Sequence, residues 1–401
     1  MWSRREFLRR FGVACSGSVA LGQTAPGWWG YAAAAAEATG SGRKLVVIEL
    51  QGGNDGLNTV IPFADDAYYR ARPTLAIAAG EVIKLDDHLG LHPAMKPWKK
   101  LWGDGQLAIV ENCGYPQPNR SHFESMDIWH GAELTPHASS GWLGRAADAS
   151  ADCDICYVGE GALPRALSRR DRSVVALEHL SDLRLRADAG GRGSFTAESN
   201  SLAATIAQRM EQARELSGRL PGEPQPTPGD AIAAAAAAGN DEPLTQRLGV
   251  IRTLLEKDEP FSVYYTALDG FDTHGAQRNT HESLWEQTSK SVADFLAELK
   301  RAKRSQDVAV FLFSEFGRRV HENGSQGTDH GAAAPVFLLG EGVRGGLQGG
   351  VPDLTDLDDG DLRHKVDFRD VYAGLLAGWL GVEPAGVIQS QGPRLELFGR
   401  T

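Results

Sequence analysis

The segment from Asp269 to Gly275, with the sequence DGFDTHG, places two carboxylates and an imidazole on one short turn. Asp272 and His274 could both ligate a borderline metal ion such as zinc, because such ions accept carboxylate oxygen and imidazole nitrogen. An all-oxygen calcium site would have no use for the imidazole. The alternative is a turn stabilised by internal hydrogen bonds, but the density of ligand-type side chains favours a metal site.

Three further segments each carry one candidate metal ligand. Asp55 stands at the apex of a glycine-rich turn, Gly-Gly-Asn-Asp-Gly, where a carboxylate could bind a cation. Its alternative role is an Asx turn in which Asp55 or Asn54 caps its own backbone. Glu315 follows an apolar run closely, and His330 precedes another within the sequence Gly-Thr-Asp-His-Gly. Together with Asp272, these residues offer the nitrogen and oxygen ligands that suit one or two ions of zinc or manganese.

Ser121 is a candidate nucleophile. It follows Arg120 and precedes a helical stretch that ends at Gly131. If Ser121 lies at the helix start, its hydroxyl is in the positive field of the helix end, where an anionic ester would be attracted to it and to Arg120. The alternative is an ordinary serine N-cap.

The remaining charged and imidazole side chains have weaker claims. Arg318 and Arg319 form either an anion clamp or a solvated pair in a loop. His92 and His122 could orient a metal ligand from behind through a hydrogen bond. Six further histidines are interpreted as surface or structural: His88, His137, His179, His281, His321 and His364.

The elements that must position these residues are apolar runs rich in β-branched residues, which predict strands. Helical patterns separate several of them, most clearly at 282–303 and 368–380. Strands that alternate with helices predict an α/β fold with a mostly parallel sheet covered by helices on both faces. In such sheets ligands collect beyond the carboxyl ends of the strands, so the candidate residues are expected to converge at one edge. The strand runs are Leu45 to Leu50, Leu107 to Val110, Val174 to Leu177, Phe261 to Leu268, Val308 to Phe313 and Val336 to Leu339.

A single domain over residues 43–401 is predicted, with a helical or flexible insertion at about 155–255. The insertion is inferred from a Pro-rich segment and an alanine run between Pro221 and Asn240. Cys153 and Cys156 form one Cys-x-x-Cys pair, which lacks the second pair of a zinc knuckle. A local disulfide or a plain loop is the expected reading.

Residues 1–36 resemble a twin-arginine export signal. Arg4 and Arg5 are followed by Phe and Leu, then by a weakly apolar stretch and a run of small residues that suits cleavage. The alternative, a basic helix of a cytoplasmic protein, does not explain that run. The apolar stretch is too short to span a membrane, which needs about 20 residues. We therefore expect a periplasmic or otherwise exported protein that meets the twin-arginine export machinery.

The charge balance limits the partners further. The formal net charge is -11, and an acidic surface gains nothing from meeting nucleic acid or anionic lipid. We therefore expect the partner to be a small molecule or a protein and not a nucleic acid. No membrane-spanning segment is expected.

Six sequence phrases together resemble an uncharacterised bacterial family catalogued as domain of unknown function 1501. The resemblance covers nearly all of the chain after the leader. The phrases are Gly52 to Asn58, Arg120 to Phe123, Gly141 to Arg145, Asp272 to His274, Ser314 to Arg318 and Gly327 to Gly331.

That family looks like a remote branch of the alkaline phosphatase and sulfatase superfamily. The resemblance implies a nucleophile beneath one or two metals, with Ser121 ten residues before Gly131 as in related enzymes. It also implies metal ligands at corresponding positions, namely Asp55, Asp272, His274, Glu315 and His330.

The sequence departs from the superfamily pattern at two points. Asp272 and His274 are two residues apart instead of four, and Phe316 stands where a metal-binding histidine is common. One metal position is therefore in doubt. Ser121 also lacks the sequence context in which sulfatases make formylglycine, which argues against a sulfatase of that type.

The leading hypothesis is an exported metal-dependent hydrolase of phosphate or related esters, acting on a small-molecule or polymer-bound anionic ester. Ser121 would be the nucleophile, and Arg120 would attract the anion. The rival hypothesis is a non-catalytic envelope protein, used in binding or assembly, that kept the fold and one metal.

Overall fold

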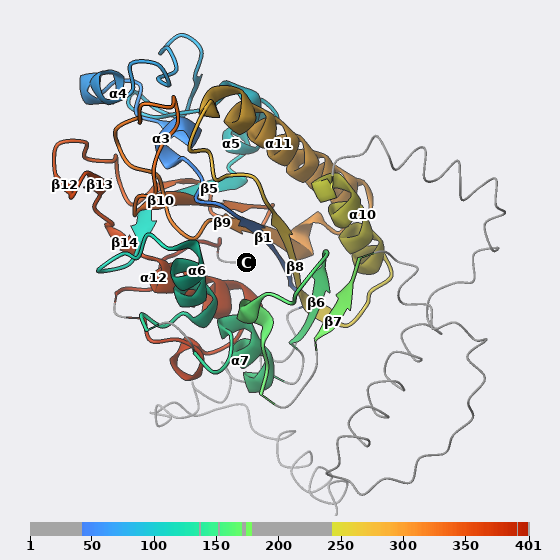
Figure 1. Cartoon of the computed structure of the whole chain (residues 1–401). Helices are drawn as coiled ribbons and strands as arrows, with labels where there is room; N and C mark the ends of the chain where they lie inside the picture. Colours follow the sequence, from blue (N-terminus) through green and yellow to red (C-terminus); the bar gives the residue numbers. More distant parts are fainter. Residues whose placement is uncertain are drawn as a thin grey trace, which may run out of the picture. The chain divides into compact units, whose positions relative to one another are not determined.

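The structure is a computed structural model that describes residues 42–135, 138–150, 153–170, 174–178, 243–390 and 392–399. The expected export signal at 1–36 lies outside the described residues. The helices and strands in Figure 1 are arranged around one central sheet.

The central sheet has nine strands and is mostly parallel. Its order is β11-β5-β10-β9-β1-β8-β6-β7, and β14 pairs with β5. Only β10 runs antiparallel to its neighbours β5 and β9 within this described sheet. The bounds are β1 Lys44–Leu50, β5 Leu107–Gly114, β6 Asp154–Val158, β7 Val175–Leu177, β8 Phe261–Leu268, β9 Val308–Phe313, β10 Ala334–Leu339, β11 Gly346–Gln348 and β14 Val366–Asp367.

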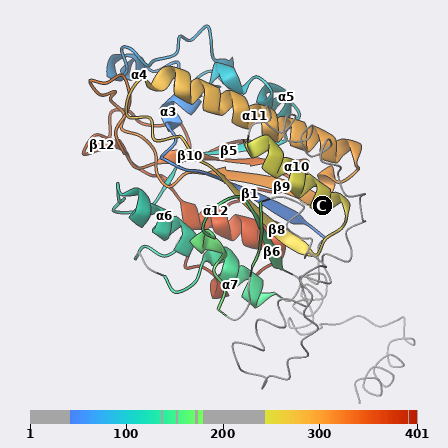
Figure 2. The ribbon, with the colours of Figure 1, turned by 45° about the vertical axis from the view of Figure 1, so that its right-hand side comes forward.

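Helices cover both faces of this sheet, which confirms the predicted fold class. The two views in Figures 1 and 2 place α5, α10 and α11 on one face and α6, α7 and α12 on the other. Strands covered on both faces must be apolar along their whole length, as the fully buried β9 sequence Val-Ala-Val-Phe-Leu-Phe is. The bounds are α5 Trp98–Gly103, α6 His122–Gly131, α7 Trp142–Ala149, α10 Pro243–Glu256, α11 Gln277–Arg301 and α12 Phe368–Leu375.

Each face has its own hydrophobic core, anchored by large aromatic side chains. Trp129 and Trp142 pack against Tyr372 on one face. On the other face Trp98 and Trp285 meet edge to face, with ring centroids 5.7 Å apart. Such aromatic pairs add about 0.5–1.5 kcal/mol beyond the area they bury, so each helix layer is fixed firmly on the sheet.

The strand register brings the functional turns to one edge. β1 is parallel to both β8 and β9, with Leu50 opposite Leu268 and Glu49 opposite Phe313. The three strands therefore end at the same level. The turns that follow them, including the Asp272 turn and the Glu315 turn, meet at this carboxyl edge as expected.

Shorter elements surround the edge. A three-stranded sheet and a two-stranded sheet lie outside the central one. Their strands and the accompanying helices are β2 Val60–Ile61, β3 Ile83–Lys84, β4 Gly90–Leu91, β12 Leu357–Asp358, β13 Asp361–Leu362, α3 Gly56–Thr59 and α4 Asp66–Ala71.

The prediction of an insertion at about 155–255 is wrong at both ends of that range. β6 and β7 extend the central sheet and α10 packs on it, so both ends of the range belong to the main fold. Residues 179–242 lie outside the described residues. Cys153 and Cys156 are buried free thiols on or beside β6, so the expected local disulfide is not formed.

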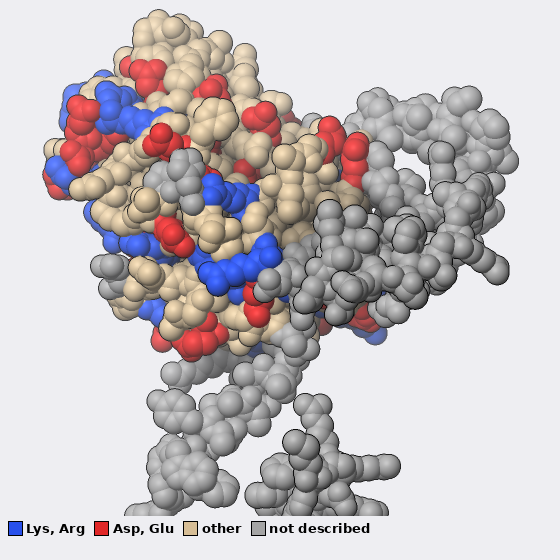
Figure 3. Space-filling model, turned by 60° about the horizontal axis from the view of Figure 1, so that its bottom comes forward, with Lys and Arg blue, Asp and Glu red and all other residues tan. Residues whose placement is uncertain are grey.

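The described residues contain no helix that is long and apolar enough to cross a membrane. On the face drawn in Figure 3, Lys and Arg side chains are mixed with Asp and Glu side chains.

Candidate metal centre

Three imidazoles converge on one carboxylate oxygen at the carboxyl edge. The Nε2 atoms of His274, His330 and His122 lie 3.1, 3.2 and 3.4 Å from Oδ1 of Asp272. The side chains come from the start of α6, the turn after β8 and the loop before β10. His274 Nε2 and His330 Nε2 are also only 2.8 Å apart. The fold thus brings three imidazole nitrogens to one carboxylate oxygen.

The other ring nitrogen of each imidazole faces a hydrogen-bond acceptor. Because a carboxylate or a carbonyl can only accept, a proton on each Nδ1 has an acceptor, and this tautomer would leave the Nε2 lone pairs for a cation. The Nδ1 distances are 2.8 Å from His122 to Glu315 Oε1, 2.7 Å from His330 to the Arg120 carbonyl oxygen and 3.2 Å from His274 to Asp329 Oδ1.

This donor set fits a divalent cation. Nε2 of His122 is buried without a hydrogen-bond partner among the described residues, although it faces Asp272 and the ring of His330. Lone pairs that face one another repel unless a proton or a cation lies between them. Acceptors behind metal-binding imidazoles fix their tautomer in the same way. Ligand atoms of His122, Asp272 and His330 all lie within 4.8 Å of one another.

The local charges shift the pKa values of these groups in different directions. A hydrogen bond to the carboxylate of Glu315 raises the pKa of His122, whereas burial lowers the pKa of His330. Burial opposes the ionisation of Asp272, but the hydrogen bond and charge of Arg318 outweigh it, so the pKa of Asp272 is lowered. Asp272 is thus held as the carboxylate that a cation needs.

Arg318 lies inside the site, and both sequence interpretations of it are wrong. Its guanidinium is fully buried and pairs with Asp272 Oδ1 at 2.5 Å. It also donates to the carbonyl oxygens of Gly53 and Thr328, at 2.7 Å each. A Cβ on Gly53 would overlap the ring of Phe316, so glycine is required for this close approach. Arg318 therefore has a structural role: it links the turns that carry Gly53, Asp272 and Thr328, and it does not bind an external anion.

Phe316 occupies the space behind the imidazoles. It is buried, and its ring centroid lies 4.9 Å from that of His122 and 4.8 Å from that of His330. Phe316, at the position where a histidine ligand is common, therefore packs against both imidazole rings and holds them in position.

Two of the predicted ligands lie elsewhere. Asp55 forms a fully buried ion pair with Arg72 at 2.5 Å and also accepts from Gln277, so its carboxylate is engaged away from the imidazoles. Burial alone would raise the pKa of Asp55, but the charge of Arg72 outweighs it and lowers the pKa. Glu315 stands behind His122 and also accepts from the Gly52 amide at 2.9 Å. It orients an imidazole instead of joining the cluster.

Ser121 occupies the N-cap of α6, and Gly131 is the last residue of that helix. The serine side chain makes no capping hydrogen bond, so the ordinary N-cap interpretation is not what the structure has. The neighbours of Ser121 both touch the cluster, through the carbonyl of Arg120 and the imidazole of His122.

The Arg120 guanidinium is already paired. It contacts Asp361 at 2.7 Å and Asp359 at 3.0 Å. Arg319 lies near the same two carboxylates, at 3.7 and 3.4 Å. The expected attraction of an anion by Arg120 is therefore weakened, because its charge is compensated within the protein.

A cavity of about 510 Å³ opens beside the cluster. Its lining includes His122, Asp272 and Glu315, and also Glu49 and His130, which the sequence interpretation did not single out as functional. Phe123 stands at its edge with 90% of its surface exposed. Glu49 could have been identified as a candidate functional residue, because it is the charged residue within the apolar run Leu45 to Leu50.

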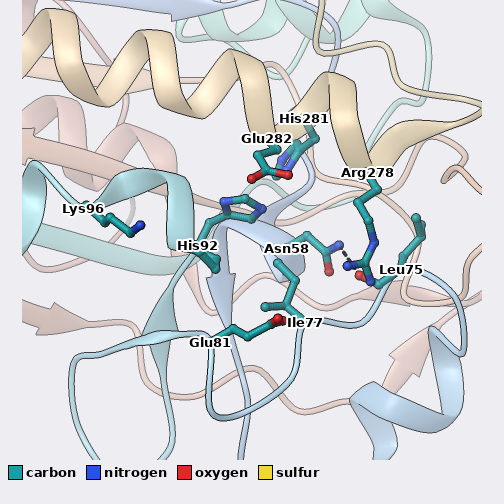
Figure 4. Close-up of a pocket in the computed structure, with 10 residues that line it drawn as sticks. Asn58, Leu75, Ile77, Glu81, His92, Lys96, Arg278, His281 and Glu282 are labelled. Atoms are coloured by element: carbon teal, nitrogen blue, oxygen red, sulfur yellow. Dashed lines mark hydrogen bonds between the residues drawn. The ribbon is translucent and has the colours of Figure 1, made fainter.

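A separate cavity of about 340 Å³ lies between α11 and the loops around β4 (Figure 4). Asn58, His92, Arg278 and His281 line it, and Arg278 donates to carbonyl oxygens of the loop at Thr74 and Ala76. His92 therefore belongs to this pocket, and the expectation that it supports a metal ligand is wrong. His281 is buried, in keeping with its structural interpretation.

The sequence from residue 42 to residue 384 matches the family described as "Protein of unknown function (DUF1501)". The chain belongs to this family. The resemblance inferred from the six sequence phrases is thereby confirmed for DUF1501, and the match includes every residue of the imidazole cluster. Comparison with curated proteins found no match.

Solved structures similar to this DUF1501 protein include members of the alkaline phosphatase and sulfatase group. The PsFucS1 sulfatase from Pseudoalteromonas sp. is 10% identical, with a TM-score of 0.42 and coverage of 89% of this chain and 72% of the other. A protein in the alkaline phosphatase superfamily from Vibrio parahaemolyticus is 10% identical, with a TM-score of 0.39 and coverage of 87% and 71%. The zinc complex of the C-terminal periplasmic domain of EcEptC from Escherichia coli is 11% identical, with a TM-score of 0.34 and coverage of 75% and 74%. At these scores the activity of this chain must be argued from its own site.

Proposed function

We propose that this protein is a metal-dependent hydrolase of phosphate or related anionic esters. The observation that carries the proposal is the orientation of His122, His274 and His330, whose Nδ1 atoms face acceptors and whose Nε2 atoms face Asp272.

His122, Asp272, His274 and His330 would hold the cation. Zinc or manganese suits imidazole together with carboxylate. A divalent cation in this place would neutralise charge on the ester and polarise it. We expect one ion and not two, because Asp55 is committed to Arg72 and Glu315 to His122.

The protein groups around the ion have distinct tasks. Glu315 and Asp329 would hold imidazoles in the tautomer that leaves the Nε2 lone pair for the cation, and buried Arg318 fixes the Asp272 carboxylate. Ser121 is the proposed nucleophile, because its hydroxyl is not used as a helix cap and both of its neighbours contact the cluster. It would attack an ester group held by the metal ion.

The charge of the cavity supports metal dependence. No Lys or Arg belongs to its described lining, whereas Glu49, Asp127, Asp269, Asp272 and Glu315 all do. An anionic ester would be repelled from these walls unless a cation attracts it. The metal, and not Arg120, would therefore supply the attraction.

We also propose that the protein is exported to the periplasm by the twin-arginine machinery, on the strength of the leader at 1–36. Changing Arg4 and Arg5 together to Lys should leave the precursor in the cytoplasm. Continued accumulation of the mature protein in the periplasm would contradict this.

Metal analysis of purified protein tests the central proposal. We expect about one equivalent of zinc or manganese in the wild type and a loss of most of it in His330→Ala. His88→Ala removes an exposed imidazole outside the cluster and serves as the matched control. A metal-free wild type that stays metal-free when supplied with either ion would contradict the proposal.

A non-catalytic envelope protein that keeps one metal is the second candidate. The ion pairs of Arg72 with Asp55 and Arg318 with Asp272 favour it, because each neutralises a carboxylate that a two-metal site would use. Protein that binds one ion tightly but hydrolyses no phosphate or sulfate ester would support this candidate.

A further inference from the structure

A second group of ionisable side chains lies at the same sheet edge. Glu49 is on the central strand β1 and is completely buried. Its Oε2 atom is 2.7 Å from Nε2 of His130 and also accepts a hydrogen bond from the hydroxyl of Tyr265, while Gln51 donates to Oε1 at 2.7 Å. A charge buried at the centre of a sheet is costly, and this one is fully hydrogen-bonded.

Glu49 is kept ionised by these partners. Burial would raise the pKa of Glu49, but the charge of His130 and hydrogen bonds from His130, Tyr265 and Gln51 outweigh it, so the pKa lies below its ordinary value. The carboxylate can only accept, so Nε2 of His130 carries a proton. This is the opposite tautomer to the one that a metal ion would require of the three imidazoles in the metal centre.

The other nitrogen of His130 is available to a ligand. No described residue hydrogen-bonds to Nδ1, and His130 lines the cavity of about 510 Å³ beside the metal centre. It also lines a neighbouring cavity of about 540 Å³, and Glu49, Gln51, His130 and Asp269 border both. A buried carboxylate that holds an imidazole at the wall of a cavity is the arrangement of an acid–base dyad.

We propose that His130 is the general acid of the proposed hydrolase, and that Glu49 is its positioning residue. The inference rests on the proposed function, since it names the group that would protonate the leaving alcohol. As Ser121 Oγ bonds to phosphorus or sulfur, the bond to the leaving oxygen breaks and its electron pair stays on that oxygen. The leaving oxygen takes the Nδ1 proton of His130, and the hydroxyl proton of Ser121 passes to solvent. The water that then hydrolyses the seryl ester supplies one proton to the ring and one to the serine oxygen. Glu49 balances the charge of the doubly protonated ring before transfer.

Helix α6 sets the distance between metal centre and acid. His122 is its first residue and His130 lies in its last turn, so about 12 Å separates them along the axis at about 1.5 Å per residue. Both side chains lean toward the N-terminus of the helix, and both line the cavity of about 510 Å³. An ester group whose anionic end faces the metal would then direct its leaving oxygen toward His130.

This geometry predicts the substrate class. A general acid matters most when the leaving group is a poor one, so the natural substrate would be an ester of an unactivated alcohol. Its alcohol portion would extend toward the neighbouring cavity, which contains Tyr157, Glu160 and Arg247.

The test compares leaving groups in the metal-loaded enzyme. His130→Gln should lose about a hundredfold or more in kcat/KM on phenyl phosphate, since general acids typically supply 10² to 10⁴ in rate. The same variant should lose only a few-fold on 2,4-dinitrophenyl phosphate, whose phenolate leaves without a proton. Glu49→Gln should show the same dependence in weaker form, and His88→Gln should match the wild type on both esters.

Two outcomes separate the inference from the function on which it rests. If the wild type is active and His130→Gln loses the same factor in kcat/KM on both esters, the inference is overturned and the hydrolase proposal is unaffected. A wild type that hydrolyses neither ester would overturn both. Nitrogen-15 NMR of the wild type tests the inference without an activity assay and without a variant that must fold. The neutral ring of His130 should carry its proton on Nε2. A neutral ring with its proton on Nδ1 would overturn the inference.

Discussion

Oδ1 of Asp272 accepts a hydrogen bond from Nη2 of Arg318 at 2.5 Å, while three imidazole Nε2 atoms face the same oxygen at 3.1 to 3.4 Å. One carboxylate oxygen therefore joins a buried guanidinium to the proposed metal ligands. Removal of the arginine and removal of an imidazole should have different effects, and these effects can be measured separately.

Arg318→Met should destabilise the fold by about 3 kcal/mol. The substitution leaves buried carbonyl oxygens of Gly53 and Thr328 without a donor, and unpaired buried groups are costly. Half-exposed Asp272 contributes less, because water screens it. Arg319→Met is the matched control and should change the free energy of unfolding by less than about 1 kcal/mol. Urea unfolding measures both, and equal losses would contradict the structural role of Arg318.

Chelation should lower the melting temperature of the wild type but not that of His330→Ala. Metal that binds only the folded state stabilises it by about 2.7 kcal/mol at a hundredfold excess over Kd, which corresponds to a shift on the order of 5 °C. Asp55→Asn should melt lower than the wild type yet keep its metal, because Asp55 pairs with Arg72 outside the cluster. Loss of metal in Asp55→Asn would show that this carboxylate is a ligand after all.

Ser121→Ala should abolish turnover of an aryl phosphate while leaving metal content and melting temperature unchanged. Loss of a nucleophile should cost a hundredfold or more, whereas loss of a cap costs about 1 kcal/mol of stability. The hydroxyl makes no capping bond, so no change in stability is expected. A variant that turns over normally but melts lower would reverse this assignment.

Acid should weaken the fold below about pH 6.5, in part through His281. Burial lowers the pKa of His281 from 6.5 to about 4. Since the folded-state pKa lies below the unfolded value, the unfolded chain takes up the proton first, and stability falls as the pH drops from 6.5 toward 4. One such group contributes up to about 1.4 kcal/mol per pH unit. His281→Gln should flatten the dependence of the unfolding free energy on pH, and His88→Gln should not. An unchanged slope in His281→Gln would contradict the role of this imidazole.

The fold was readable from the sequence because buried parallel strands are continuous apolar runs. Val308 to Phe313 is such a run and forms β9 as predicted. The antiparallel direction of β10 was not readable, because strand composition does not encode direction. The helix expected at 282–303 begins earlier, at Gln277, since the preceding turn leads directly into it.

The candidate site was partly predictable. Asp272, His274 and His330 meet because their turns follow or precede strands of one sheet. His122 was given only a supporting role, since its place at the start of a helix did not reveal that its ring reaches Asp272. Asp55 was predicted as a metal ligand, but it pairs with Arg72, which lies beyond a separate helix. The sequence of a turn does not show whether its carboxylate pairs with a metal ion or with an arginine.

The position of β1 in the sheet also dictates when the site can form. Leu45 pairs with Val263 on one side and with Ala309 on the other. During synthesis the first strand must therefore wait with both edges unpaired until most of the chain has left the ribosome. Folds with such distant pairings are slow to form, and an unpaired apolar strand is prone to aggregate. Folding of this protein is thus expected to be a late event that depends on the whole chain, so that truncation before β9 should yield insoluble material instead of a smaller domain.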